Sequence, residues 1–215
     1  MSDNIINVKE TIRSFIKNKL VSDFPLFFPT NNKKVYWEDT KPNDREDFPY
    51  CFLEIESETI DGFDDFNKYE LRTISNVKHL YKIETEHNNI VVGFNICSSR
   101  DDTNANNALK LNGLQSQNLA QKMIRTLRRK LRNDESLSWF SNGNNPYNFR
   151  IGIETQNISP IQYLPDWEET RDKHKFRFTC SFNWIDVYET EVDIAEAINI
   201  VEINNEDTDI VIDLI

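Results

Sequence analysis

Residues 164–184, LPDWEETRDKHKFRFTCSFNW, contain the clearest structural pattern of the chain. From Phe176 to Trp184 the even-numbered side chains are aromatic or thiol groups, and from Lys175 to Asn183 the odd-numbered ones are charged or polar. This alternation predicts a strand about 33 Å long with one buried and one solvated face. The most ordered part of the chain is therefore predicted to be a packing surface and not a reaction centre.

Two segments have the apolar periodicity of amphipathic helices. In residues 5–20 the apolar stripe consists of Ile5, Val8, Ile12, Phe15, Ile16 and Leu20. In residues 114–132 it consists of Ala120, Met123, Ile124, Leu127 and Leu131. We expect each helix to bury this stripe against a sheet.

Further strands are expected at 34–37, from Pro49 to about residue 60, at 79–86, 90–97 and 149–154, and near 198–203. His87-Asn88-Asn89 is predicted to be a hairpin turn, and residues 61–78 a loop. These elements indicate an α+β fold, a mainly antiparallel mixed sheet with helices packed on one face. We expect a single domain over residues 1–203 and an acidic C-terminal extension over residues 204–215.

The composition is that of a globular protein. A single domain of 215 residues buries about 70% of the surface of its unfolded chain and needs no metal or disulfide to fold. Cys51, Cys97 and Cys180 are odd in number and far apart, which favours buried free thiols in a reducing compartment, the cytosol. No apolar run approaches the roughly 20 residues of a membrane helix.

The net charge of −11 is unevenly distributed along the chain. No Lys or Arg follows Arg177, whereas residues 186–215 contain ten Asp and Glu. Residues 1–185 hold the remaining 26 of the 36 acidic residues and all 25 Lys and Arg, so this part is almost neutral. A protein that binds free nucleic acid more often has a net basic surface.

The sequence lacks the common nucleotide-binding, hydrolase and metalloprotease motifs. One acidic cluster consists of Glu54, Glu56 and Glu58 on one face of a predicted strand, followed by Asp61, Asp64 and Asp65. Glutamates at alternate positions are typical of the solvated face of a strand. Two-metal nucleases also place acidic residues in this way. Both interpretations stay open.

Basic residues gather at the end of the second predicted helix: Arg125, Arg128, Arg129, Lys130 and Arg132. Positive charge at a helix C-terminus complements the helix dipole, and the same residues could form a partner surface. The acidic extension ends in apolar residues, Ile210 to Ile215. We expect it to add as a strand to this sheet or to the sheet edge of a neighbouring subunit.

The order of these parts resembles the tail terminator (neck terminator, tail completion) proteins of tailed bacteriophages. The resemblance covers residues 5–203 and rests on four segments. They are the first helix with the Trp37-to-Tyr50 turn and its DFPY, the hairpin leading into GLQSQNLAQKMIRTLRRKLR, the loop LPDWEETR, and the alternating strand with its IVEI ending. The acidic loop after Ile60 and the extension after Ile203 depart from the family pattern.

The resemblance implies a structural virion protein of the tail or neck, without catalysis, cofactor, metal or membrane. Six copies would form a ring on the last ring of the tail tube and stop its polymerisation. The partners would be the tail tube protein, head-side connector or neck proteins, and a sheath as a further candidate. Genomic DNA would pass through the ring without specific binding. The alternatives are another neck component (head-tail joining or sheath-end protein) and a metal-dependent nuclease built on the Glu54-to-Asp65 acids.

A closed ring needs two different complementary surfaces on each subunit. The candidate interface residues are Arg125, Arg128, Arg129, Arg132, Trp167, Glu168, Arg171, Asp207 and Asp209. We expect the acidic extension to contact a neighbouring subunit near the basic helix end. For the Trp167-to-Arg171 group, a local ion pair that fixes the loop and a subunit contact are both open.

Overall fold

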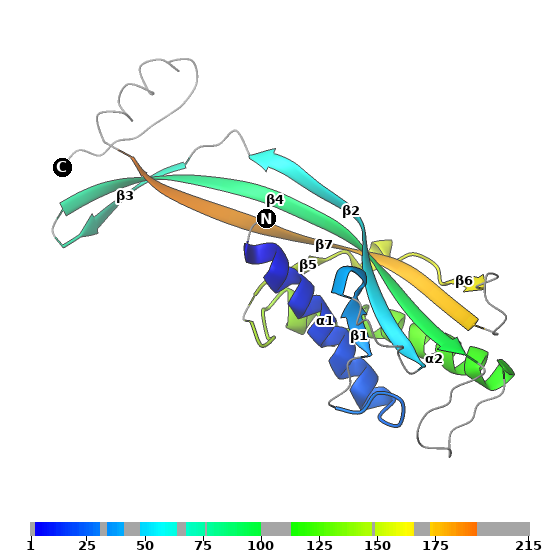
Figure 1. Ribbon diagram of the computed structural model, residues 1–215. Coiled ribbons are helices and arrows are strands. Elements are labelled where there is room, and N and C mark those ends of the chain that lie inside the picture. The colour runs from blue at the N-terminus through cyan, green and yellow to red at the C-terminus, as the bar shows by residue number, and fades with distance from the viewer. Residues whose placement is uncertain are drawn as a thin grey trace. The chain divides into compact units, whose positions relative to one another are not determined.

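A computed structural model describes residues 3–30, 34–40, 48–63, 68–75, 77–99, 113–147, 149–165 and 173–192 (Figure 1). The chain divides into two compact units. The first comprises residues 1–60 and 88–184, and the second comprises residues 61–87 and 185–215. Strands β2 (Tyr50–Phe63), β4 (Val77–Ser99) and β7 (Lys173–Val192) contribute residues to both units.

The helices of the described residues belong to the first unit: α1 (Asp3–Asp23), α2 (Gly113–Lys130) and α3 (Asp134–Phe140). Two short 3-10 helices, η1 (Glu38–Thr40) and η3 (Thr155–Asn157), lie in the same unit. Both predicted apolar stripes are buried, and Ile5, their most accessible member, is 5% exposed. The two predicted helices are therefore confirmed, with α1 slightly longer at each end.

The strands form one mixed sheet in the order β1-β2-β4-β7-β5, with β3 paired to β4 and β6 paired to β7. The shorter strands are β1 (Val35–Trp37), β3 (Lys68–Ile74), β5 (Gly152–Ile153) and β6 (Gln162–Pro165). Strand β1 runs parallel to β2, whereas β3, β5 and β6 are antiparallel to their partners. The predicted α+β class with a mainly antiparallel mixed sheet is confirmed.

The core of the first unit lies between the helices and one face of the sheet. Figure 1 shows α1 and α2 on the same side of the strands. Alternate residues of β4 and β7 point toward them: Ile90, Val92, Phe94 and Ile96 from β4, and Phe176, Phe178, Cys180, Phe182 and Trp184 from β7. The Phe94 and Phe178 rings stack with centroids 4.9 Å apart. The buried face predicted for residues 176–184 is thus confirmed, and it forms the sheet side of the core.

The predicted hairpin turn at residues 87–89 was wrong. Strand β4 passes through these residues without a break, and Asn88 is buried. Its neighbours β2 and β7 flank β4 on either side, and sheet pairing of this kind overrides the weak strand propensity of His and Asn. The loop predicted over residues 61–78 was also wrong, because the end of β2, the whole of β3 and the start of β4 lie in this range. The turn lies at Ser75, whose positive φ of 53° connects β3 to β4.

Other sequence predictions differ in extent. The strand predicted over residues 149–154 is only two residues long, as β5. Helix α3 and strand β6 were not predicted, because segments this short carry little periodicity. The edge strand predicted over residues 34–37 is confirmed as β1. The strand predicted at 198–203 and the extension 204–215 lie outside the described residues.

The packing of β7 on the helices leads to a first prediction. Phe178→Ala should lower the free energy of unfolding by about 3–5 kcal/mol, because it leaves a cavity beneath the stacked Phe94 ring. Urea denaturation monitored by circular dichroism would measure the loss. Thr179→Val, one residue away on the opposite face, should change stability by less than about 1 kcal/mol. Equal losses in the two variants would contradict the assignment of faces.

Candidate subunit and partner interface

The C-terminal end of α2 presents an exposed basic strip. Arg125 and Arg129 are four residues apart, which places them on one side of the helix, and Arg132 follows just beyond its end. All three side chains are exposed and form no ion pair with any other residue in the described ranges. Because these charges are not neutralised within the described part of the chain, they are available to an acidic partner.

Arg128, the fourth predicted interface arginine, is engaged inside the first unit. Its Nε donates a hydrogen bond to the Ser159 carbonyl over 2.9 Å, and its Nη2 donates one to the Ile158 carbonyl over 3.2 Å. Burial, and secondarily the Arg132 charge, lower the pKa of Arg128. This side chain fastens the segment before β6 to α2.

Lys130 also has partners within the chain, through an ion-pair cluster that joins the three helices. Its Nζ lies 3.6 Å from Glu135 on α3 and 3.9 Å from Asp23 on α1. Lys19 of α1 donates to the same Glu135 carboxylate over 3.0 Å. Lys19, more than Lys130, lowers the pKa of Glu135. The basic cluster of the sequence therefore divides into two groups. Arg128 and Lys130 bind other residues of the first unit, whereas Arg125, Arg129 and Arg132 form the exposed strip.

The remaining predicted interface residues, Trp167, Glu168, Arg171, Asp207 and Asp209, lie outside the described residues. Their proposed ion pair and subunit contacts stay predictions.

The acidic face of β2 is paired with an arginine from β7. The Nη2 atom of Arg177 lies 2.5 Å from Glu56 Oε1 and 3.3 Å from Glu54 Oε2. Gly93 on β4 makes room for this cluster, since a Cβ there would lie 2.7 Å from the Glu56 carboxylate and 3.0 Å from Arg177. Glu54 and Glu56 thus use a side chain of the same unit as their counterion, which favours the structural interpretation of the acidic strand.

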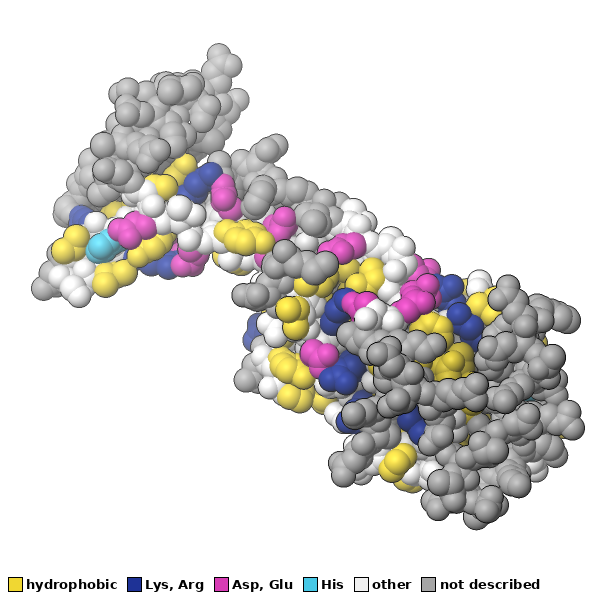
Figure 2. Space-filling model, in the orientation of Figure 1, with side chains coloured by type: hydrophobic (Ala, Val, Ile, Leu, Met, Phe, Trp, Pro, Cys, Tyr) yellow, Lys and Arg dark blue, Asp and Glu magenta, His cyan; other side chains and the backbone are white. Residues whose placement is uncertain are grey.

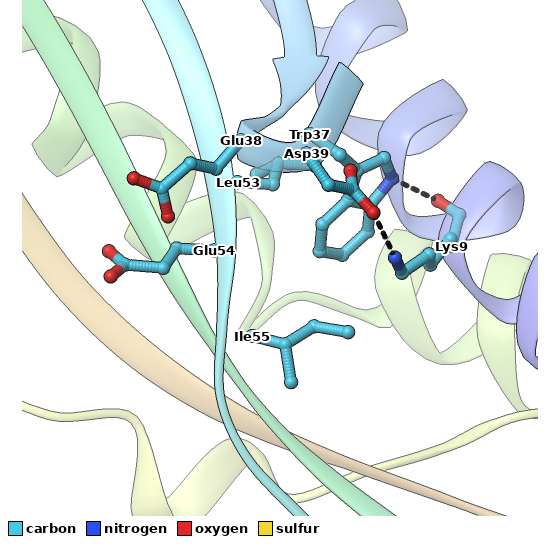
Figure 3. Close-up of a pocket in the computed structure, with 7 residues that line it drawn as sticks. All are labelled: Lys9, Trp37, Glu38, Asp39, Leu53, Glu54 and Ile55. Carbon is cyan, nitrogen blue, oxygen red and sulfur yellow. Dashed lines mark hydrogen bonds and ion pairs between the residues drawn. The ribbon is translucent and has the colours of Figure 1, made fainter. Parts of the chain in front are cut away.

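A shallow pocket lies between α1 and the edge of the sheet, lined by Lys9, Trp37, Glu38, Asp39, Leu53, Glu54 and Ile55 (Figure 3). Lys9 Nζ lies 2.8 Å from Asp39 Oδ2, and the Trp37 indole N–H donates to the Lys9 carbonyl over 3.2 Å. The Lys9 ammonium also lies 5.4 Å from the centroid of the Trp37 ring. These contacts fix β1 to α1.

In the second unit, β3, the first half of β4 and the end of β7 form a ribbon held by surface ion pairs. The Arg72 guanidinium contacts both Glu189 oxygens, at 2.7 and 2.8 Å, and Glu70 at 3.2 Å. It also lies 5.0 Å from the centroid of the Tyr81 ring. His79 Nδ1 lies 2.6 Å from Glu191. The hydrogen bonds from Arg72 lower the pKa of Glu70 and of Glu189.

Comparison with known families shows which family of proteins carries these surfaces. The family model described as phage neck terminator protein matches residues 7–209. The chain belongs to the phage neck terminator family. The family gives this neck terminator a structural role in the phage tail or neck, and it confirms the resemblance found in the sequence. A search of curated proteins found no match.

No helix within the described ranges of the neck terminator is long and apolar enough to span a bilayer.

Sequence reasoning missed an aromatic cluster on the neck terminator. The Tyr36 and Phe52 rings stack at 6.3 Å, and Tyr50 lies within ring contact of Tyr36, Phe48 and Phe52. Lys175 on β7 lies 4.8 Å from the centroid of the Phe52 ring. Aromatic residues at positions 50 and 52 were a signal for one shared face, but the contribution of Tyr36 depends on the parallel pairing of β1 with β2.

The Arg177 cluster makes a second prediction. Arg177→Met should lower the free energy of unfolding by about 1–3 kcal/mol, because it leaves two half-buried carboxylates side by side without a counterion. Adding Glu54→Gln and Glu56→Gln to Arg177→Met should restore much of the loss. A double-mutant cycle in urea would measure the coupling, and additive effects would contradict it.

The ribbon makes a third prediction, on pH. Glu70 and Glu189 should titrate below the ordinary glutamate value of 4.5, because Arg72 stabilises their charged forms. A lowered pKa in the folded state favours folding above pH 4.5, and this contribution is lost as the pH falls through the folded values. Carboxyl carbon NMR would measure both titrations. Arg72→Gln should move them back toward 4.5, and unchanged titrations in that variant would contradict the cause.

Proposed function

We propose that this neck terminator forms a ring of six copies that caps the tail tube, stops its polymerisation and joins the tail to the head-side connector. The single observation that carries this proposal is the family match over residues 7–209, nearly the whole chain. The partners are other copies of the chain, the tail tube protein and head-side neck proteins, with a sheath as a further candidate. The protein acts in the virion.

The charges of the chain supply two different surfaces for a ring. One is the exposed strip Arg125, Arg129 and Arg132. The other is the acidic extension, residues 204–215, which contains four acidic residues and no basic one. In a closed ring, one surface of each subunit contacts the other surface of the next. We infer that the acidic extension engages the basic strip of a neighbouring subunit.

The same charge distribution suits passage of DNA through the ring. Phosphate contacts with Lys and Arg release counterions and hold DNA in place. A channel lined by acidic or paired residues would let DNA slide, and Arg177 paired with two glutamates is one example of such neutralisation.

The function proposed here is not enzymatic. Glu54 and Glu56, on which a nuclease mechanism would depend, face Arg177 in the structure. Incubation of the purified protein with plasmid DNA and Mg²⁺ should leave the DNA intact. Cleavage that is lost in Glu54→Gln would favour the nuclease instead.

Ring formation can be tested on the purified full-length chain. Native mass spectrometry should give six times the chain mass of 25.4 kDa, and negative-stain electron microscopy should show closed rings. Added to polymerising tail tube protein, the rings should bind one tube end and limit tube length. A persistent monomer, or unchanged tube growth, would contradict the proposal.

The charge pairing makes a fourth prediction. Cutting the chain after Ile203, or changing Arg125, Arg129 and Arg132 together to Glu, should shift the hexamer toward monomer in native mass spectra. High salt should also shift wild type toward monomer, but less than the variants shift. The reason is that salt only partly screens charges that are in close contact. Arg150→Glu, at an exposed arginine outside α2, is the matched control and should keep the ring. An intact hexamer in both altered chains would contradict the contact.

A further inference from the structure

The outer edge of β7 is occupied by other strands only over its first half. Strand β6 pairs with residues 174–177 and β5 with residues 182–183. From residue 185 to residue 192, no strand in the described part of the chain pairs with this edge. Strand β3 has the same property on the other side of the ribbon, since it pairs with β4 alone. Among the described residues, the ribbon of the second unit therefore has two open edges.

The hydrogen bonds of β7 show which residues face its open edge. The Ser181 carbonyl accepts a bond from the Glu154 amide, and the Thr179 carbonyl accepts one from the Ser159 amide. Odd-numbered residues thus direct their backbone groups outward. By the period of two along a strand, Ile185, Val187, Glu189 and Glu191 do the same. Such a row of backbone donors and acceptors is a template for another strand.

The ribbon also lacks a hydrophobic core of its own. All buried hydrophobic residues of the described ranges belong to the first unit. In the ribbon Leu71, Ile74, Val77, Ile185, Val187 and Tyr188 are instead exposed, by 38% to 56%. Figure 2 shows hydrophobic side chains at the surface between acidic and basic ones. Small sheets without a packed apolar face are marginally stable in water, so this ribbon would gain from a partner.

The two open edges differ in charge and are similar in length. The edge of β3, residues 68–74, carries Lys68, Glu70 and Arg72, a net charge of +1. The edge of β7, residues 185–192, carries Asp186, Glu189 and Glu191, a net charge of −3, of which Glu189 also contacts Arg72 and Glu191 also contacts His79 within the same ribbon. Two β7 edges would repel one another, whereas a β7 edge and a β3 edge attract. This asymmetry favours head-to-tail association over a symmetric dimer.

We propose that residues 185–192 of one subunit pair with residues 68–74 of a second copy, so that the sheet continues from subunit to subunit. The partner of each open edge is thus the other edge of the same protein. This contact deepens the proposed ring, on whose self-assembly it rests, and it is separate from the contact between the acidic extension and the arginine strip.

Two threonines make a cross-linking test possible. Thr73 and Thr190 are exposed and lie on the same face of the ribbon. Thr73 is opposite residue 78 of β4, so it shares a face with the even-numbered residues of β4. One of these, Glu86, accepts a hydrogen bond from Tyr188, so Thr190, two residues further along β7, lies on that face as well. Strand β4 separates them within one subunit, so their Cα atoms are at least about 10 Å apart, too far for an internal disulfide. The native thiols Cys51, Cys97 and Cys180 are buried and leave a low background.

The fifth prediction is a disulfide between subunits. Thr73→Cys/Thr190→Cys in the full chain should give covalent ladders up to the hexamer under mild oxidation. Each single variant alone should give none, and a mixture of the two should give dimers. Thr73→Cys with Asn183→Cys is the matched control, because β5 already covers the β7 edge at Asn183. Dimers from Thr190→Cys alone would show β7-to-β7 pairing and overturn the proposal.

A second variant tests the backbone bonds directly. Val187→Pro removes an outward amide but keeps the bonds to β4, so the chain should stay folded by circular dichroism. Its subunit dissociation constant should rise roughly tenfold or more, since an edge hydrogen bond and an apolar contact are lost. Val187→Thr keeps the amide and the branched shape and should assemble normally. A native-mass hexamer without the cross-link overturns the edge pairing alone, whereas absence of any oligomer in wild type overturns the proposed ring as well.

Discussion

The packing of two helical stripes on one alternating face of the sheet is the constraint on which the rest of the first unit depends. The stacked Phe94 and Phe178 rings, and Phe140 against Phe182 at 5.4 Å, join β4, β7 and α3 in one core. From Phe176 to Trp184 each β7 side chain on this face is at most 5% exposed. Because the pleat alternates, burying this face turns Arg177 and its odd-numbered neighbours away from the core, and the ion pairs with β2 follow from that geometry.

The charges of the chain fall into two classes once this core is formed. Arg128, Lys130 and Arg177 have partners within the first unit, on backbone carbonyls or carboxylates. The exposed strip at the end of α2 has no such ion pairs in the described part of the chain. In a structural protein of the phage neck, such exposed arginines are suited to contact other subunits. An acidic surface on a neighbouring subunit would neutralise their charge.

The ribbon of the second unit follows a different physical rule. It buries no hydrophobic side chain, and its ion pairs lie at the surface, where each contributes little to stability. Two of its strands, β4 and β7, are nevertheless long and contribute residues to both units. A neck terminator that works by assembly can keep such strands with open edges, since another subunit would supply the missing hydrogen bonds and apolar contacts.

The sequence by itself determined the α+β class, both long helices and the buried face of β7, since their periodicity is local and the side chains carry the signal. It also grouped the arginines of α2, but only the tertiary structure separated Arg128, bonded to the Ser159 carbonyl, from its exposed neighbours. The unbroken course of β4 through Asn88 was likewise decided by its neighbours on either side. Contacts between residues distant in the chain depend on sheet pairing, which local propensity does not encode.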